Sequence, residues 1–227
     1  MMLIAATVAS VLVASTLLAA APSTSASLPG VPPLTIHVTA ADDVAPSLIA
    51  RVLAEADAIW RPAGVTFIWR RESRVAVPYA RVSETGPAAP NTLRVRIGGD
   101  RGAARDGRAP LGWIVFDDER LPSQEIYVSH ANAVAMLQDS GGVVGVVDQM
   151  PSSQRDTLLG RALGRALAHE LGHYLLASKI HTPKGLMKAV LTASEMFLPD
   201  TGGFRIEPAQ RLTVAARLSA EPQVASR

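Results

Sequence analysis

The sequence of 227 residues contains no cysteine, and this absence limits its chemistry in three ways. It excludes disulfide bridges, thiolate metal ligands and cysteine nucleophiles, so any bound metal must use nitrogen and oxygen ligands. Aromatic residues are also scarce, at 4% of the chain. The arginines between residues 70 and 108 are scattered and have no aromatic platform among them. We therefore expect no nucleic-acid binding, which usually needs a denser basic patch with stacking residues.

Charge is missing from the first part of the chain. Residues 1–21 contain no charged side chain and are rich in Leu, Val, Ala and Ile, and small residues follow at 22–27. This order is typical of a secretory signal peptide, so we expect residues 1–27 to be removed and the protein to be secreted or periplasmic. Because no Lys or Arg precedes the apolar run, an uncleaved membrane anchor with an extracytoplasmic protein behind it is the alternative.

The remaining residues, 28–227, are enough for one substantial hydrophobic core, since 48% of the chain is hydrophobic. We expect a single domain and a monomer. Apolar and polar residues alternate, as in half-buried strands, over segments 34–39 and 93–97, and the largely apolar segments 65–69, 111–116 and 125–128 predict three more strands. Helical spacing of apolar residues occurs over four others: 46–60, 130–137, 152–173 and 207–218. Residues 72–90 and 98–110 are rich in Pro, Gly or charge and predict loops.

This order of elements predicts an α+β fold, with a mixed sheet packed on one long helix and a further helix at the C-terminal end. No internal repeat is evident.

The chemistry of the chain is concentrated in residues 169–173, His-Glu-Leu-Gly-His. His169 and His173 are four positions apart on the predicted helix, so both rings lie on one face and can reach the same ion. Glu170 lies about 100° around the helix from His169, where its carboxylate can take a proton from a metal-activated water. The pattern therefore predicts a hydrolytic zinc site. The alternative is a pair of core histidines, but a buried Glu170 would then need a partner of its own.

His181 is the predicted third ligand, and it requires the helix to end before it. On a continuous helix it would lie about 12 Å along the axis from His173, far beyond a Zn–N bond. Pro183 and Gly185 supply breaks in the sequence that follows, and the small residues Ala177 and Ser178 offer a place for the bend. An exposed loop histidine is the alternative.

On these residues the chain resembles the zincin metallopeptidases, and within them the metzincin-like branch. That family has a Gly three residues after the second His, a third His three residues later, and a methionine in a tight turn downstream. This sequence has Leu176 and Lys179 at the first two positions, and its histidine arrives two residues later. Met187 resembles the methionine that forms an apolar floor beneath the metal, although ordinary core packing would also explain it.

The resemblance implies a zinc metallopeptidase, most often an endopeptidase, that acts on a peptide or protein substrate. It also implies that segment 111–116 is the antiparallel edge strand along which an extended substrate pairs. Two alternatives stay open. Glu195 could replace His181 as the third ligand, as in gluzincins. The chain could also be a non-catalytic metal-binding or protein-binding module, but a structural zinc would have no need of Glu170.

Overall fold

The computed structural model describes residues 31–72, 93–99 and 109–220. The predicted signal peptide or anchor at residues 1–27 and most of the two predicted loops lie outside these ranges. The strands are β1 (Leu34–Ala40), β2 (Phe67–Arg71), β3 (Leu93–Gly98), β4 (Gly112–Asp118) and β5 (Leu121–Ser129). The α-helices are α1 (Pro46–Trp60), α2 (His130–Asp139), α3 (Gly141–Val144), α4 (Ser152–Leu176), α5 (Ala193–Phe197) and α6 (Pro208–Ala220). Short 3-10 turns are η1 (Arg61–Ala63), η2 (Val147–Gln149) and η3 (Gly202–Phe204).

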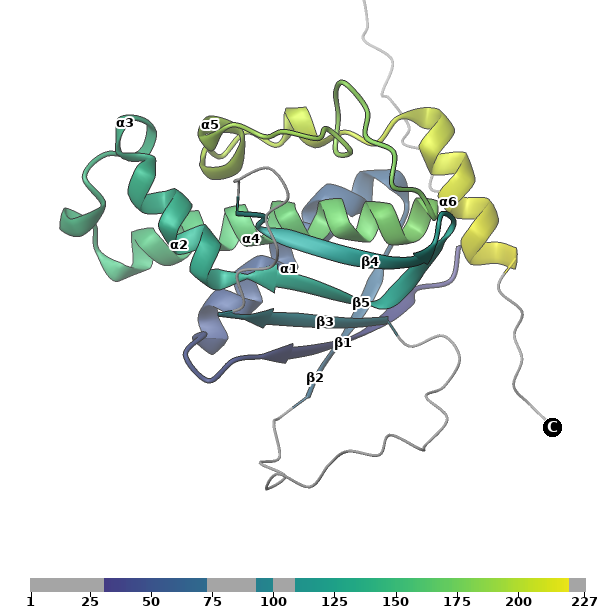
Figure 1. The fold of residues 1–227 in the computed structure, drawn as a ribbon, viewed down its shortest axis with the longest axis horizontal. Helices are drawn as coiled ribbons and strands as arrows, with labels where there is room; N and C mark the ends of the chain where they lie inside the picture. Colours follow the sequence, from purple (N-terminus) through teal and green to yellow (C-terminus); the bar gives the residue numbers. More distant parts are fainter. Residues whose placement is uncertain (1–30, 73–92, 100–108, 221–227) are drawn as a thin grey trace, which may run out of the picture.

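Within the described residues, the five strands form one mixed sheet in the order β2-β1-β3-β5-β4 (Figure 1). Strands β2, β1, β3 and β5 run parallel, and β4 is antiparallel to β5, to which a tight turn joins it. The predicted mixed sheet with a long helix and a C-terminal helix is confirmed. The strand predicted at residues 111–116 is indeed an antiparallel edge strand.

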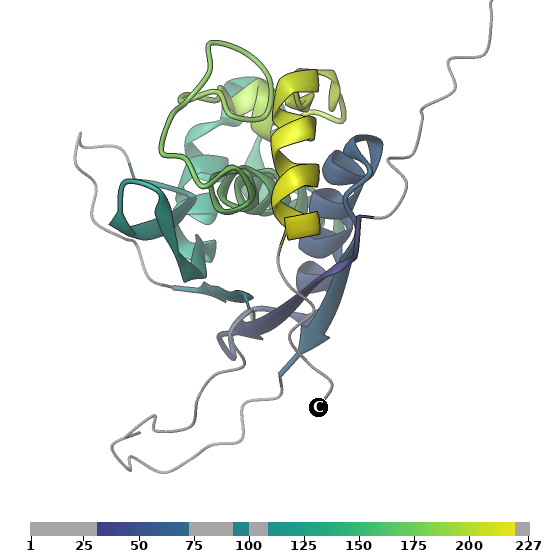
Figure 2. The same cartoon turned by 90° about the vertical axis from the view of Figure 1, so that its right-hand side faces the viewer.

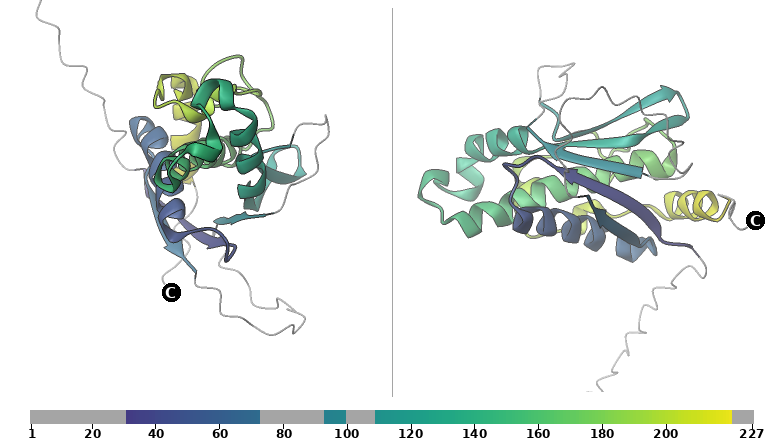
Figure 3. Two further views of the ribbon diagram at one scale, coloured as in Figure 1. Left: turned by 90° about the vertical axis from the view of Figure 1, so that its left-hand side faces the viewer. Right: turned by 90° about the horizontal axis from the view of Figure 1, so that it is seen from below.

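The helices gather on one face of the sheet. Helix α4 packs along α1 and against β4 and β5, and α6 packs on α4 (Figures 1 and 2). Ile36, Val38 and Val95 on this face are buried, because side chains alternate between the two faces of a strand. The buried Trp60 at the end of α1 donates its indole N–H to the carbonyl of Ala168 in α4 at 3.0 Å. The opposite face of the sheet carries no described helix, as the view from below shows (Figure 3).

Several element boundaries differ from the sequence predictions. Strand β2 begins at Phe67, two residues later than predicted. Strand β5 begins at Leu121, four residues earlier than predicted, and its Pro122 stands opposite Phe116. A short helix that the sequence did not predict, α3, begins at Gly141. None of the described helices has the length and apolar composition needed to cross a membrane.

Candidate metal centre

Helix α4 carries the first part of the site in its last two turns. His169, Glu170 and His173 lie on this 25-residue helix, and Glu170 and His173 are buried. The helix can approach its neighbours closely because it has glycines at the contacts. A Cβ on Gly164 would lie 2.8 Å from the backbone oxygen of Val52 in α1. The tight α1–α4 contact therefore fixes the position of the two histidines relative to the core.

The helix ends where the third ligand requires it to end. Ala177 adopts a left-handed conformation with φ 47° and ψ 46°, and its N–H donates to the carbonyls of His173 and Tyr174. The N–H of Ser178 also donates to the His173 carbonyl, at 3.3 Å. This is a C-terminal capping arrangement that satisfies the last carbonyls and turns the chain out of the helix. The bend predicted at Ala177 or Ser178 is present.

The bend brings His181 back to the two helical histidines. One ring nitrogen from each of His169, His173 and His181 can be chosen so that all three lie within 4.8 Å of one another. The Nε2 atoms of His169 and His173 are 3.1 Å apart. The ring centroid of His181 lies 5.2 Å from that of His169 and 4.9 Å from that of His173. His173 is buried, His169 is half-buried and His181 is exposed, so the group opens to solvent on the His181 side.

Backbone carbonyls hold the other nitrogen of the two helical rings. The Nδ1 of His169 lies 2.8 Å from the oxygen of Leu186, and the Nδ1 of His173 lies 2.6 Å from the oxygen of Ser178. A carbonyl can only accept, so each Nδ1 carries the proton and donates it. Each Nε2 is then left with a free lone pair that faces the shared point, which is the tautomer of a metal-binding histidine.

The surroundings also keep these rings neutral. Burial, and next the proximity of His173, lower the pKa of His169 from 6.5 to about 4. Burial likewise lowers the pKa of His173 and of His181. Because a metal ion competes with protons for the ring nitrogens, neutral imidazoles are the form that a metal site requires.

Glu170 is held between the helix and the edge strand. Burial raises the pKa of Glu170 to about 8, against a hydrogen bond from the backbone N–H of Ile114 in β4 that lowers it. Space for this carboxylate depends on Gly112, since a Cβ there would lie 2.9 Å from the Glu170 Cγ. Sequence reasoning missed both contacts. They join residues almost 60 positions apart, and no local pattern signals them.

Met187 lies directly under the helix that carries the two histidines. It is 1% exposed, and a Cβ on Gly172 would lie only 2.3 Å from its sulfur. Gly172, between Glu170 and His173, therefore makes room for the methionine. The segment around Met187 is fixed to the core, since the N–H of Leu186 donates to the carbonyl of Arg205 at 3.0 Å.

Glu195, the rival third ligand, is engaged elsewhere. Its carboxylate accepts from Lys188 Nζ at 2.7 Å and from the N–H of Thr192 at 2.8 Å, as part of a capping box at the start of α5. The hydrogen bond from Lys188 is the main reason why the pKa of Glu195 is lowered. Among the described residues, the group able to hold a metal comprises His169, His173 and His181. His37 lies on β1 beside Glu72, and His130 begins α2.

Two further side chains, Phe116 and Lys179, flank the three histidines. Neither of them was predicted from the sequence to have a role in the site. Phe116, on the edge strand β4, places its ring edge-on to His173 with centroids 6.5 Å apart. The Lys179 Nζ lies 5.2 Å from the centroid of the Phe116 ring. The contact joins the edge strand to the bend after α4, so β4 lies beside the three histidines. The strand predicted at 111–116 includes Phe116, but its sequence does not indicate the contact with the site.

The comparisons with known proteins are sparse. No protein-family model and no curated protein matches the sequence. Among solved structures, the crystal structure of archaemetzincin from Methanopyrus kandleri is similar, with a TM-score of 0.48 and 15% identity. The alignment covers 87% of this chain and 98% of that chain. At this level of similarity, the geometry of the site remains the basis for assigning a function. Fold and site together define a mixed α/β protein with a three-histidine group able to hold a metal ion.

Proposed function

We propose that the protein is a zinc-dependent metallopeptidase, with His169, His173 and His181 as metal ligands and Glu170 as general base and acid. One observation carries the proposal. Three imidazoles from two sides of a chain reversal converge on one point, beside a buried carboxylate on the same helix. A purely structural zinc site would be closed by a fourth protein ligand and would not need that carboxylate.

The residues present fit a zinc ion. Two nitrogens at the usual Zn–N distance from a tetrahedral ion are separated by about 3.3 Å. The Nε2 atoms of His169 and His173 lie 3.1 Å apart. Three neutral nitrogen ligands and an approach from solvent also match catalytic zinc, which keeps one coordination position open. When bound, zinc would polarise the scissile carbonyl and make a water molecule more acidic.

Glu170 supplies the proton transfer. Without a metal, burial raises the pKa of Glu170 to about 8, so the carboxyl is protonated at neutral pH. A nearby cation lowers this pKa and favours the carboxylate. As carboxylate, Glu170 accepts the proton of the attacking water and then delivers it to the leaving amine. The hydrogen bond from Ile114 orients the side chain toward this task. Met187 beneath the helix is the counterpart of the family's methionine turn in this proposal.

The edge strand β4 accounts for substrate binding in the proposal. It lies at the end of the sheet, so one side of its backbone has no partner strand among the described residues. An extended peptide could pair there and pass in front of the histidines, with main-chain hydrogen bonds providing affinity. Peptide or protein substrates fit such an edge better than small esters, which offer no backbone to pair with it.

The test is the substitution Glu170→Gln, with Glu195→Gln as the matched control on the rival glutamate. We expect Glu170→Gln to keep its zinc and to lose hydrolysis of an unfolded protein by about a hundredfold or more. Glu195→Gln should keep both. Zinc is measured by atomic emission, and hydrolysis by release of peptides from casein. Zinc binding without hydrolysis in the parent protein would support the non-catalytic alternative. Loss of zinc in Glu195→Gln would support the gluzincin-type ligand set.

Export to the periplasm or the cell exterior, and a monomeric state, stay predictions from the sequence.

A further inference from the structure

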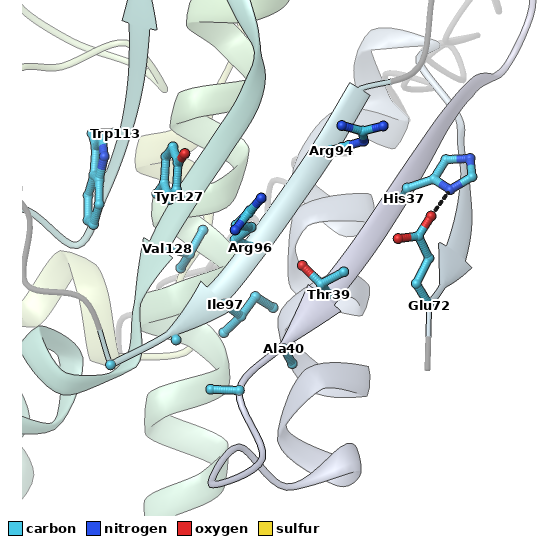
Figure 4. Close-up of a pocket in the computed structure, with 13 residues that line it drawn as sticks. His37, Thr39, Ala40, Glu72, Arg94, Arg96, Ile97, Trp113, Tyr127 and Val128 are labelled. Carbon is cyan, nitrogen blue, oxygen red and sulfur yellow. Dashed lines mark hydrogen bonds and ion pairs between the residues drawn. The ribbon is translucent and has the colours of Figure 1, made fainter. Parts of the chain in front are cut away.

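The face of the sheet that carries no described helix contains a cavity of about 470 Å³ (Figure 4). It lies over β1, β3 and β5, away from the metal centre, and polar and aromatic side chains line it. The side chains that matter here are His37, Arg94, Arg96, Trp113 and Tyr127. Its volume falls in the range of small-molecule sites, about 300–1,000 Å³.

The hollow results from the heights of neighbouring side chains. Strand register aligns Thr39, Arg96, Tyr127 and Trp113 in one row across the sheet. The rings of Trp113 and Tyr127 stack with centroids 5.2 Å apart and stand up from the sheet at one end of this row. Toward the carboxyl ends of β1 and β3 the lining residues are small: Ala40, Ala41, Gly98 and Gly99. Small residues beside a tall row leave a depression.

One end of the depression, at Ala40, Gly98 and Gly99, lies where ligands commonly bind to parallel sheets, whereas Arg94, the second residue of β3, lies toward its other end. From β1 the chain continues through α1 to β2 on one side, whereas β3 leads to β4 and β5 on the other. The β1–β3 pair is therefore the point at which the strand order reverses. In open α/β sheets, small molecules bind outside the carboxyl ends of the strands at such a point.

The charge on this face is arranged unusually. Arg70, His37 and Arg94 are direct neighbours in register across β2, β1 and β3. Two guanidinium-bearing side chains, Arg70 and Arg94, therefore flank the ring of His37 on this face. His37 has its own partner, since its Nδ1 lies 2.5 Å from the carboxylate of Glu72.

Arg94 lacks the partner that its position offers. Glu125 stands opposite Arg94 in register, but its carboxylate is taken by the Nε of Arg96 and by the hydroxyl of Tyr127. Across the part of the chain that the structure describes, the Arg94 guanidinium has no hydrogen-bond or ion-pair partner. Its planar fork of N–H donors at the cavity wall suits a bidentate oxyanion.

We propose that this cavity binds a small molecule with a phosphate or carboxylate group, and that Arg94 holds that group. Arg96, fixed by Glu125, adds positive charge on the same strand, and the stacked aromatic pair forms the wall against which the rest of the ligand lies. A nucleic-acid strand fits less well, because Glu72 and Glu125 on the same face would repel a run of phosphates. The site is independent of the metal centre, which lies on the helical side of the sheet.

Isothermal titration calorimetry on the full-length, zinc-loaded protein tests the proposal, with inorganic phosphate and succinate as separate probes. We expect saturable binding of at least one, and the tighter of the two identifies the head group. Arg94→Gln should weaken that binding by about tenfold or more, because it removes a charged bidentate partner. Arg155→Gln is the matched control, since Arg155 is an exposed arginine at the start of α4.

Four outcomes would overturn the proposal. They are absence of saturation with both probes, an equal loss in Arg155→Gln, no loss in Arg94→Gln, and tighter binding of a twelve-residue thymidine oligonucleotide than of either probe. Zinc content is measured in every variant, because an anion that binds at the metal would respond to zinc and not to Arg94. Thermal melting confirms that Arg94→Gln is folded, as expected for a side chain on the exposed face.

Discussion

At the scale of single residues, the site depends on groups whose charge the fold suppresses. His169 and Glu170 are neighbours in sequence, yet burial shifts the pKa of the histidine down to about 4 and that of the glutamate up to about 8. Both shifts favour the uncharged form, which is the expected effect of a low-dielectric environment. A bound cation would reverse this for Glu170, because a nearby positive charge favours the ionised carboxylate.

The shift of Glu170 predicts how the metal-free protein responds to pH. In the unfolded chain this carboxyl loses its proton near pH 4.5, whereas in the folded protein it keeps the proton to about pH 8. The unfolded state therefore binds fewer protons over this interval, and stability falls as pH rises. His169 acts in the opposite direction but only between about pH 4 and 6.5, where the unfolded ring takes up a proton first.

The window from pH 6.5 to 8 thus isolates Glu170. We expect the melting temperature of EDTA-treated protein to decrease across it, and the decrease to be smaller in Glu170→Gln, which has no carboxyl to ionise. Calorimetric melting at four pH values in this window measures the difference. Parallel curves for the two proteins would contradict the assignment of a raised pKa to Glu170.

The sequence predicted these residues only as far as local spacing reaches. The His169–His173 pair and the adjacent Glu170 follow from helical periodicity, and Pro183 indicated a break that frees His181. The support from Gly112 and Ile114 could not be predicted, because it comes from a strand that only the folded chain brings to the helix. Arg165 shows the converse. A charged residue on an apolar helix predicts exposure, yet its side chain is fully buried.

At the scale of elements, the end of α4 is the decisive feature. Ala177 turns the chain with a positive φ, a conformation that costs about 1–2 kcal/mol for a residue with a Cβ. Glycine is the usual residue at this position of a helix C-terminus. The sequence predicted the bend here because small residues precede a proline, although it could not indicate that an alanine adopts the left-handed conformation.

Ala177→Gly should therefore stabilise the protein by about 1 kcal/mol, since it removes this strain without changing a hydrogen bond. The gain is expected to be smaller than the full strain, because glycine also increases the entropy of the unfolded chain. Urea denaturation measures the change, with Ala54→Gly on the exposed side of α1 as a control that should lose stability. A loss of stability in Ala177→Gly would contradict the role given to this residue.

Other elements were predicted in type more reliably than in extent. The four long helices and five strands follow from periodicity, because each buries one face against the core. The start of β2 at Phe67 and the inclusion of Pro122 in β5 depend on pairing with strands distant in sequence. Helix α3 has two glycines in its first turn, so its formation depends on tertiary context and not on propensity.

At the scale of the whole molecule, Arg165 connects segments that the chain brings together from far apart. Its Nε donates to Glu55 of α1 at 2.8 Å, and its Nη1 donates to the carbonyl of Glu195 in α5 at 2.5 Å. Its guanidinium also lies 4.9 Å from the ring centroid of Phe204. Because Leu186 and Arg205 lie in the same C-terminal part, this residue helps to hold the segment beneath the metal site on the helical core.

Arg165→Ala should destabilise the protein by about 3 kcal/mol or more, because it leaves the carboxylate of Glu55 without its buried partner. The control is Arg161→Ala, one turn earlier on α4, which removes one hydrogen bond to the carbonyl of Phe197 and should cost about 1 kcal/mol. The double variant Arg165→Met with Glu55→Gln should recover part of the stability lost in Arg165→Ala, because it leaves no unpaired carboxylate. Equal losses in the two alanine variants, measured by urea denaturation, would contradict a special role for Arg165.

The bare face of the sheet was the least predictable part of the molecule. His37 lies on the face of β1 opposite the buried Ile36 and Val38. Its alignment with Arg70 and Arg94 depends on the order in which the strands assemble, and this order is not encoded in any local pattern. The row of Thr39, Arg96, Tyr127 and Trp113 that borders the cavity depends on the same assembly, so no local pattern predicts the cavity.

The chain reversal at Ala177 has a consequence for how a three-histidine site is recognised in a sequence. A helix dictates the interval between His169 and His173, whereas a solvent-exposed bend delivers His181, so the helix does not fix the number of residues between His173 and His181. A search template with a rigid interval would find Lys179 where it expects an imidazole and would discard the chain. The three imidazole rings still converge in space, and a rule based on sequence spacing does not detect this convergence.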